Sequence, residues 1–237
     1  TITVTQKASA STTVDATTST SILNLGETNT ATADAASVTG SMTVPATNNA
    51  AIGTIAVTLK NTAGTTRTSE SYTAQVLSGP GLLGSGAQAV THTFAATSRL
   101  ITVQNGHVVG IFPDGSSGTS KIEIRTMAGV LIGTETVIFH GAIASIATTV
   151  VKATIGASAA TGVLTAVAKD KDGTVVQSGT LYAISGTATV IASGGSAAIT
   201  AGKATFDLTG LVAGTTAITV ANAATAATVS STRPMFE

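Results

Sequence analysis

Residues 106–124, GHVVGIFPDGSSGTSKIEI, read like residues 202–220, GKATFDLTGLVAGTTAITV. Without a gap, Gly118 aligns with Gly214, and the aliphatic residues that follow coincide at an offset of 96 residues. A period near one hundred residues indicates tandem copies of a domain, because solenoid repeats have periods of about 20–50 residues. We expect the shared glycine to supply a tight turn before the penultimate strand of each copy.

The preceding segments also match, at a different offset. Residues 53–65, GTIAVTLKNTAGT, align with residues 162–174, GVLTAVAKDKDGT, at an offset of 109, and Tyr72 aligns with Tyr182 at 110. The drop from 110 to 96 predicts an insertion of roughly fourteen residues in the first copy. Insertions are tolerated best in surface loops, so we place this one between residues 79 and 104.

The local sequence pattern predicts an all-β protein. Short runs such as IAVTL at residues 55–59 and IEIR at 122–125 alternate large apolar with small or polar residues, as strands do, and Gly, Asn and Asp separate them. No long run has apolar residues at helical spacing. About seven short strands per copy indicate a β-sandwich. We expect Tyr72 and Tyr182 on the third strand of each copy, filling a core that lacks Trp.

Four segments follow from the repeat. Residues 1–35 are interpreted as the end of an upstream domain followed by a Ser/Thr/Ala-rich connector, in which residues 21–25 are alternatively an edge strand. Residues 36–140 are a sandwich with the insertion, and residues 141–231 are a second sandwich. Residues 232–237 are a tail without a counterpart in the first copy.

The first residues indicate an upstream neighbour. Residues 2–10, ITVTQKASA, resemble residues 218–226, ITVANAATA, although chance likeness in a Thr/Ala-rich sequence is the alternative. The sequence starts at Thr1 without an initiator Met or a signal peptide. We therefore expect a piece, or a processed product, of a longer protein.

These features resemble a known family. The hairpin KDKDGT at residues 169–174, the strand GKATF at 202–206 and the strand-containing run LVAGTTAITV at 211–220 are similar to bacterial immunoglobulin-like domains. Such modules occur in adhesins of the invasin and intimin type and in surface-layer proteins. The resemblance covers residues 141–230 well and 36–140 less well, because the first copy lacks the acidic hairpin residues and carries the insertion. It implies tandem immunoglobulin-like β-sandwiches.

Composition excludes several classes of function. Of 237 residues only 9% are charged and the net charge is zero, so there is no basic field to bind nucleic acid or an anionic membrane. The absence of Cys excludes disulfides, thiol nucleophiles and thiolate metal sites. No stretch of about 18 residues is apolar enough to span a bilayer, so we expect no membrane insertion.

Two segments match known binding motifs in sequence, but each is explained more simply as a turn or loop. GPGLLG at residues 79–84 matches a dinucleotide fingerprint, but strand-like residues follow it where that site needs a helix. DKDG at residues 170–173 begins like a calcium loop, but the twelfth position is Leu181 instead of Glu. We interpret it as a hairpin turn and keep a weak calcium site, assisted by Asp207, as the alternative.

The histidines are His92, His107 and His140, and none has a second His or a carboxylate at a zinc spacing. His140 adjoins the predicted junction at Gly141, where a hydrogen bond across the junction would make a pH-sensitive hinge. There is no Gly-x-Ser-x-Gly nucleophile motif. We predict no catalytic, cofactor-binding or metal-binding residues.

The functional hypothesis is a structural module, without catalysis, of an extracellular multidomain surface protein of the surface-layer or stalk type. Its expected partners are further copies or neighbouring domains of the same protein. The first alternative is an adhesin that binds a host protein or glycan through loops, with residues 79–104 as the candidate surface. The second is a phage virion or capsid-decoration protein.

Overall fold

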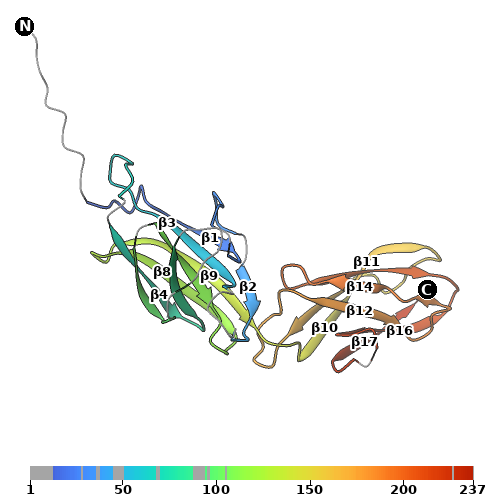
Figure 1. The fold of residues 1–237 in the computed structure, drawn as a ribbon. Coiled ribbons are helices and arrows are strands. Elements are labelled where there is room, and N and C mark those ends of the chain that lie inside the picture. The colour runs from blue at the N-terminus through green and yellow to red at the C-terminus, as the bar shows by residue number, and fades with distance from the viewer. Residues whose placement is uncertain are drawn as a thin grey trace, which may run out of the picture. The chain divides into compact units, whose positions relative to one another are not determined.

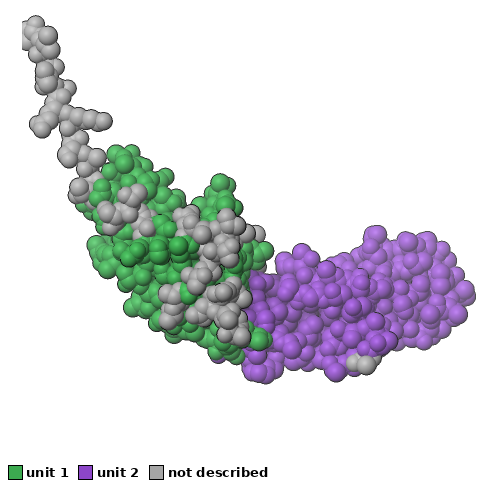
Figure 2. Space-filling view, in the orientation of Figure 1, with its two compact units in different colours: residues 1–38, 43–115, 119–138 green, residues 39–42, 116–118, 139–237 purple. Residues whose placement is uncertain are grey.

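The computed structural model describes residues 13–27, 29–35, 38–44, 51–67, 70–87, 94, 97–104, 106–225 and 227–236. Within these ranges the chain forms strands and turns and no helix, so the all-β class is confirmed (Figure 1). It separates into two compact units (Figure 2). Unit 1 holds residues 1–38, 43–115 and 119–138, and unit 2 holds 39–42, 116–118 and 139–237. The likeness predicted at residues 2–10 lies outside the described residues.

The first nine strands form two sheets, ordered β1-β3-β7-β5 and β2-β9-β8-β4-β6. Their inward side chains alternate with outward ones along most strands, which makes a buried layer between the sheets. The strands are β1 (Thr20–Leu25), β2 (Val38–Ser41), β3 (Gly53–Thr58), β4 (Ser71–Ser78), β5 (Leu82–Ala87), β6 (Leu100–Gln104), β7 (His107–Phe112), β8 (Gly118–Thr126) and β9 (Leu131–His140).

The last eight strands repeat this wiring. Their sheets are ordered β10-β11-β15-β13 and β14-β12-β16-β17, so each strand from β10 onward has a counterpart in the first sandwich and β2 is additional. The strands are β10 (Ser145–Val150), β11 (Ala159–Lys169), β12 (Thr180–Ser185), β13 (Ile191–Ala192), β14 (Gly195–Ala198), β15 (Ala204–Gly210), β16 (Thr215–Ala221) and β17 (Ser230–Phe236). The expected tandem sandwiches are confirmed.

The strand ladders fix how the two copies correspond. Ala74 on β4 pairs with Ile124, and Ala183 on β12 pairs with Val220. Because Ile124 and Val220 are equivalent in the repeat, Ala74 corresponds to Ala183. The offset at β4 is therefore 109 residues instead of 110.

This one-residue difference overturns the match between the two tyrosines. The counterpart of Tyr72 is Leu181, and both side chains are completely buried. Tyr182 is only half-buried on the other face of β12, because a shift of one residue along a strand reverses the face. The prediction that Tyr182 fills the core is wrong, and Leu181 does so instead. Within residues 36–140 Tyr72 lies on β4, the third strand after β2 and β3, and Tyr182 lies on β12, the third strand of the second copy, as predicted.

The segment predicted to be a surface loop contains two strands. Residues 82–87 form β5 and residues 100–104 form β6, the counterparts of the shorter β13 and β14. The extra length of the first copy therefore lies partly in β5, which has six residues where β13 has two. The loop interpretation is wrong for these residues, and positions 88–93 and 95–96 lie outside the described residues.

Both ends of the chain hold more strand than the sequence indicated. Residues 20–25 pair along their whole length with β3 as an edge strand of unit 1, so the alternative of an edge strand at residues 21–25 is confirmed and the connector interpretation is wrong there. Residues 230–236 pair with β16, so most of the predicted tail belongs to the last strand. Pro234 obscured this strand, but Pro is tolerated at an edge, and β17 is an edge strand.

The glycine at equivalent positions of the two copies, Gly118 and Gly214, is needed for a different reason in each. Gly118 has a φ of 143°, so at the start of β8 it adopts a conformation that side chains disfavour, as expected for a turn. Gly214 is not left-handed, and a Cβ there would lie 3.1 Å from the Val190 side chain. In the second copy close packing, not turn geometry, favours glycine.

Each unit ties its two sheets together from the same position of its first strand. Ser21 donates to Glu135 on β9 at 2.7 Å. Its counterpart Thr148 accepts from Arg233 on β17, with 3.0 Å between Nε and Oγ1. The correspondence follows because Leu23 and Val150 pair with equivalent positions of β3 and β11. The same link is thus made with an acid in unit 1 and a base in unit 2.

Candidate functional site

Residues 79–84 form a turn and the start of β5. Gly79 has a φ of 79°, and a Cβ there would collide with the backbone of Thr119. The N–H of Gly81 donates to Asp114 at 2.8 Å, and Arg99 donates to the Gly79 carbonyl at 2.9 Å. The glycines therefore allow close backbone packing. A strand follows, so the helix N-terminus on which a dinucleotide phosphate would rest is replaced by β5.

Asp170 holds the hairpin turn that its sequence predicts. Its Oδ1 accepts from the backbone N–H groups of Asp172 at 3.0 Å and Thr174 at 2.8 Å, and its Oδ2 accepts from Gly141 at 2.9 Å. Gly173 supplies the left-handed residue, with a φ of 85°. Both carboxylate oxygens thus face N–H donors, whereas calcium needs several oxygens directed at one point.

The electrostatics of Asp170 follow from these bonds. Burial by itself would raise the pKa of this carboxyl, but the hydrogen bonds that it accepts, first those from the N–H groups of Gly141 and Thr174, together outweigh burial, so the pKa is lowered. Asp207, the residue considered as an assisting ligand, accepts from the Gly162 N–H at 2.7 Å instead. Among the residues that the structure describes, no three His, Cys, Asp or Glu side chains gather as metal ligands would.

Unit 1 builds the same turn with an amide. The Asn61 side-chain oxygen accepts from Ala63 at 3.1 Å and Thr65 at 2.9 Å, and Gly64 is left-handed with a φ of 75°. Asn61 and Asp170 are 109 residues apart, which matches the offset of the flanking strands. The position is Asn in one copy and Asp in the other, and in both its side chain stabilises the turn.

The histidines are placed separately. The Nδ1 of His107 lies 3.4 Å from the Ser85 hydroxyl. His140 is buried, with its Nδ1 3.1 Å from the Gly141 carbonyl and its Nε2 3.4 Å from the Ser178 hydroxyl. These contacts lie within unit 2, and the pH-sensitive hinge stays a prediction. His92 lies outside the described residues.

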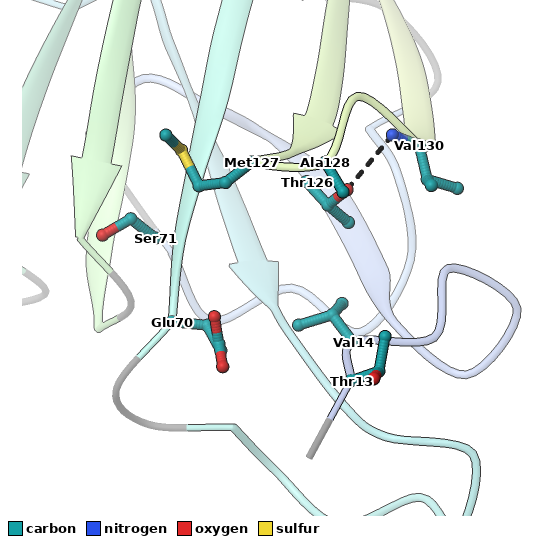
Figure 3. A pocket seen from close by; sticks show the side chains of 8 residues that line it. All are labelled: Thr13, Val14, Glu70, Ser71, Thr126, Met127, Ala128 and Val130. Atoms are coloured by element: carbon teal, nitrogen blue, oxygen red, sulfur yellow. Dashed lines mark hydrogen bonds between the residues drawn. The ribbon is translucent and has the colours of Figure 1, made fainter. Parts of the chain in front are cut away.

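A pocket of about 230 Å³ lies at one end of unit 1 (Figure 3). It is bounded by the segment before β1, the start of β4 and the turn between β8 and β9. That turn is held by Thr126, whose hydroxyl accepts from the Val130 N–H at 3.1 Å. Its lining residues are Thr13, Val14, Glu70, Ser71, Thr126, Met127, Ala128 and Val130.

The lining of this pocket is suited to apolar contact. Met127 is 60% exposed and Val130 is 51% exposed although both are large apolar residues. The carboxylate of Glu70 lies 3.4 Å from Arg67, so this acid is paired at the rim. The volume is below the roughly 300 Å³ at which small-molecule pockets begin. Sequence analysis missed this site, although the run MAGVL at residues 127–131 is unusually apolar for a turn.

The segment 79–104, the candidate surface for adhesion, has a buried aromatic residue. Phe94, the aromatic residue of the segment 79–104, is 5% exposed and packs edge-to-face on Phe112 with ring centroids 5.2 Å apart. A Cβ on Gly110 would lie 2.5 Å from the Phe94 ring, so that glycine makes room for it. Phe94 is therefore a core residue, not a platform for a ligand.

A second depression of about 430 Å³ lies on unit 2, where the half-buried Tyr182 borders small residues. Its lining residues are Tyr182, Ala183, Ile184, Ser193, Gly195, Ser196 and Ala224. One aromatic ring beside serine hydroxyls is the arrangement that could contact a sugar.

No family model matches the sequence, and no curated protein is similar to it. Solved structures match the chain at low identity and with TM-scores below 0.5. A glycosyl hydrolase family 2 member from Bacteroides cellulosilyticus DSM 14838 is 12% identical with a TM-score of 0.38, over 92% of this chain and 28% of that chain. Invasin, a bacterial integrin-binding protein, is 16% identical with a TM-score of 0.34, over 94% of this chain and 41% of that chain.

The S-layer protein rSbsC(31-844) is 17% identical with a TM-score of 0.32, over 78% of this chain and 23% of that chain. The chain thus spans less than half the length of each of these three proteins. The described part of the chain has no helix able to cross a membrane.

Proposed function

We propose that the chain is a structural module of an extracellular multidomain surface protein, of the surface-layer or stalk type, and that it performs no catalysis. The observation that carries this proposal is the repeated sandwich, in which equivalent polar residues such as Asn61 and Asp170 hold equivalent turns. Asp170 and Asp207, the residues considered as calcium ligands, accept backbone N–H groups of the fold. Tandem domains with few charged residues repel one another little, which favours packing against further copies of the same domain.

The resemblance of residues 169–174, 202–206 and 211–220 to bacterial immunoglobulin-like domains supports the same function. Neutral faces rich in Thr and Ser allow copies to approach without strong repulsion, since only 9% of residues are charged. The expected partners are therefore copies of this chain or neighbouring domains of its protein.

Self-assembly of the purified full chain tests this proposal. We expect negative-stain images and sedimentation to show end-joined or lattice-like assemblies as concentration rises, in the presence or absence of calcium. Isolated monomers at every concentration and calcium level would contradict the self-associating role.

Glycan binding is the second candidate, favoured by the depression around Tyr182. A glycan array probed with the full chain and with Tyr182→Ala distinguishes the two. Glycan binding that disappears with Tyr182→Ala would support an adhesin. An array without binding would contradict glycan recognition and favour the structural module.

A further inference from the structure

The outer edge of β1 in unit 1 is covered by a segment of its own chain. The Leu23 N–H donates to the Asp34 carboxylate at 2.9 Å, and the Ala35 N–H donates to the Leu23 carbonyl at 2.8 Å. Asn24 holds the start of this segment, because its side-chain oxygen accepts from the Ala31 N–H at 3.0 Å. Asp34 and Ala35 thus satisfy the edge groups of Leu23 much as an added strand would, and Leu23 is only 3% exposed.

The equivalent edge of unit 2, on the edge strand β10, is open at Val150. Val150 corresponds to Leu23, because the two residues pair with equivalent positions of β11 and β3. The Val151 N–H donates to the Val163 carbonyl at 2.8 Å. Since the direction of these groups alternates along an antiparallel strand, the N–H and the carbonyl of Val150 point away from β11.

These outward groups of Val150 are available to another chain. Among the residues that the structure describes, none hydrogen-bonds to them, and Val150 is partly exposed where its counterpart Leu23 is buried. Unpaired N–H and carbonyl groups on an edge strand can receive an extended segment of another polypeptide. Unit 1 shows which chemistry this edge accepts, namely a carboxylate followed by a backbone N–H.

The charges beside the two edges are opposite. Burial raises the pKa of Glu135, and the negative charge of Asp34 raises it further, so in unit 1 the covering segment brings two acids together. In unit 2 Arg233 takes the place of Glu135, and its Nη2 lies 3.3 Å from the Thr148 carbonyl, two residues along the same edge from Val150. Within the described residues Arg233 forms no ion pair. A carboxylate at this edge would therefore be attracted instead of repelled.

We propose that the edge of β10 at Val150 binds an extended acidic segment of a separate protein by strand addition. The carboxylate of an Asp in that segment accepts from the Val150 N–H and lies beside Arg233, and the N–H of the next residue donates to the Val150 carbonyl. Hydrogen bonds to a charged acceptor are stronger than neutral ones, which selects Asp over Asn at this position. The site is distinct from the self-association of the proposed function and does not depend on it.

An NMR titration of the isotope-labelled full chain tests this site. The probe is a peptide with blocked ends and the sequence of residues 29–35, NTATADA, and the matched control is the same peptide with Asp34→Asn. We expect the Val150 amide signal to shift and to saturate in the millimolar range of peptide. The control peptide should bind about fivefold more weakly, because it offers a neutral acceptor.

Two substitutions in the protein separate the edge from its charge. Val150→Pro removes the outward N–H without removing a bond to β11, and Pro is tolerated on an edge in that orientation, so binding should be lost while the chain still folds. Arg233→Gln should weaken binding of the Asp peptide about fivefold and leave the Asn peptide unchanged. Arg125→Gln is the matched control, since Arg125 pairs with Glu123 at 2.8 Å in unit 1. Thermal unfolding checks that each variant folds, and Arg233→Gln decides the matter if Val150→Pro does not.

Three results would overturn the inference. The first is a Val150 signal that does not move up to millimolar peptide, or that responds equally to both peptides. The second is a shift of Leu23 in place of Val150, which would mean that the peptide displaces residues 31–35 from β1. The third is a Val150 shift that appears without peptide as the protein concentration rises, which would identify a second copy of this chain as the occupant instead of a separate protein.

Discussion

The outer face of one sheet differs between the two units although the wiring is the same. In unit 1, Val108, Gly110 and Phe112 on β7 are all buried, because Phe94 packs over them. The pairing of Val108 with Ala56 and of Thr205 with Thr165 sets the offset between β7 and β15 at 97 residues, so the offset of 96 read from the sequence is wrong by one on this strand. In unit 2 the equivalent positions on β15 are polar and largely exposed to solvent. Those positions are Thr205, Asp207 and Thr209.

This difference shows how an insertion changes a sandwich without changing its topology. A strand buried on both faces has a nearly continuous apolar sequence, as HVVGIF on β7 does. A strand with one face in water alternates, as ATFDLTG on β15 does. The first unit thus has a small additional core that the second lacks, consisting of Ala51, Phe94, Val108 and Phe112 with Ala56 and Leu82 beside it.

The largest expected effect separates the two tyrosines that the sequence aligns. Tyr72→Ala should lower the free energy of unfolding of unit 1 by about 3–5 kcal/mol, because a large, fully buried ring is removed. Its hydroxyl also donates to the His107 carbonyl at 2.9 Å. Tyr182→Ala should lower that of unit 2 by less than about 1 kcal/mol, since this side chain is only partly buried. Urea titration of the full chain measures both, and equal losses would mean that the register assigned to β12 is wrong.

The additional core of unit 1 is tested at Gly110. Gly110→Ala should destabilise unit 1 by about 1–3 kcal/mol, because its Cβ would overlap the Phe94 ring. Gly156→Ala is the control, since a Cβ there meets no atom within 4 Å. Combining Gly110→Ala with Phe94→Ala should remove the overlap, so the double substitution is less destabilising than the sum of the singles. Strict additivity would show that Phe94 does not cover Gly110.

The turn residue Asp170 should respond to both substitution and pH. Asp170→Ala should destabilise unit 2 by about 2–3 kcal/mol by leaving three N–H groups without their acceptor. Asp170→Asn should lose less, because Asn61 holds the equivalent turn.

The pH dependence of the Asp170 contribution follows from its lowered pKa. The folded state favours the carboxylate, so this contribution is complete above the usual pKa of 3.8 and is lost as pH falls through the lower folded value. Chemical denaturation of the unmodified chain and Asp170→Ala across acidic pH should therefore converge. A difference that grows towards low pH would contradict the assigned bonds.

The smallest expected effect concerns the link between the sheets of unit 1. Burial, opposed by the Ser21 hydroxyl and reinforced by the charge of Asp34, raises the pKa of Glu135. The folded state then retains a proton that the unfolded state has lost, so stability falls as pH rises from the usual value of 4.5. Glu135→Gln keeps an acceptor for Ser21 and should modestly stabilise unit 1 at neutral pH but not at pH 4. Thermal unfolding at the two pH values checks this, and a loss of stability at neutral pH would count against it.

The class of fold could be predicted because it depends on patterns that persist along whole strands. Many residues contribute to the alternating apolar pattern between glycines at residues 106–124 and 202–220. A misalignment by one position therefore leaves the predicted fold class unchanged. The pairing of Tyr72 with Tyr182 failed because it relied on one residue type, and a slip of one position reverses the face. Strand β17 was missed, and β1 was predicted only as the alternative to a connector, since Ser, Thr and Pro weaken the apolar signal in these edge strands.

The candidate sites depended on contacts between distant segments. The Asp170 turn is local, since its acceptor and two of its donors lie within five residues, and the sequence indicated it. The apolar pocket joins residues 13–14, 70–71 and 126–130, which no local pattern connects. Phe94 looked like part of an exposed loop because its partner on β7 is far along the chain.

The central claim is that two sandwiches of the same wiring each enclose a core of their own. Hydrogen exchange of the full chain carrying Phe206→Ala tests it most directly, because Phe206 is 1% exposed at the centre of unit 2. We predict that exchange accelerates in β11 and β15 while β3 and β7 keep the protection of the unmodified chain. Equal acceleration in β3 and β7 would show one continuous core and would contradict the account.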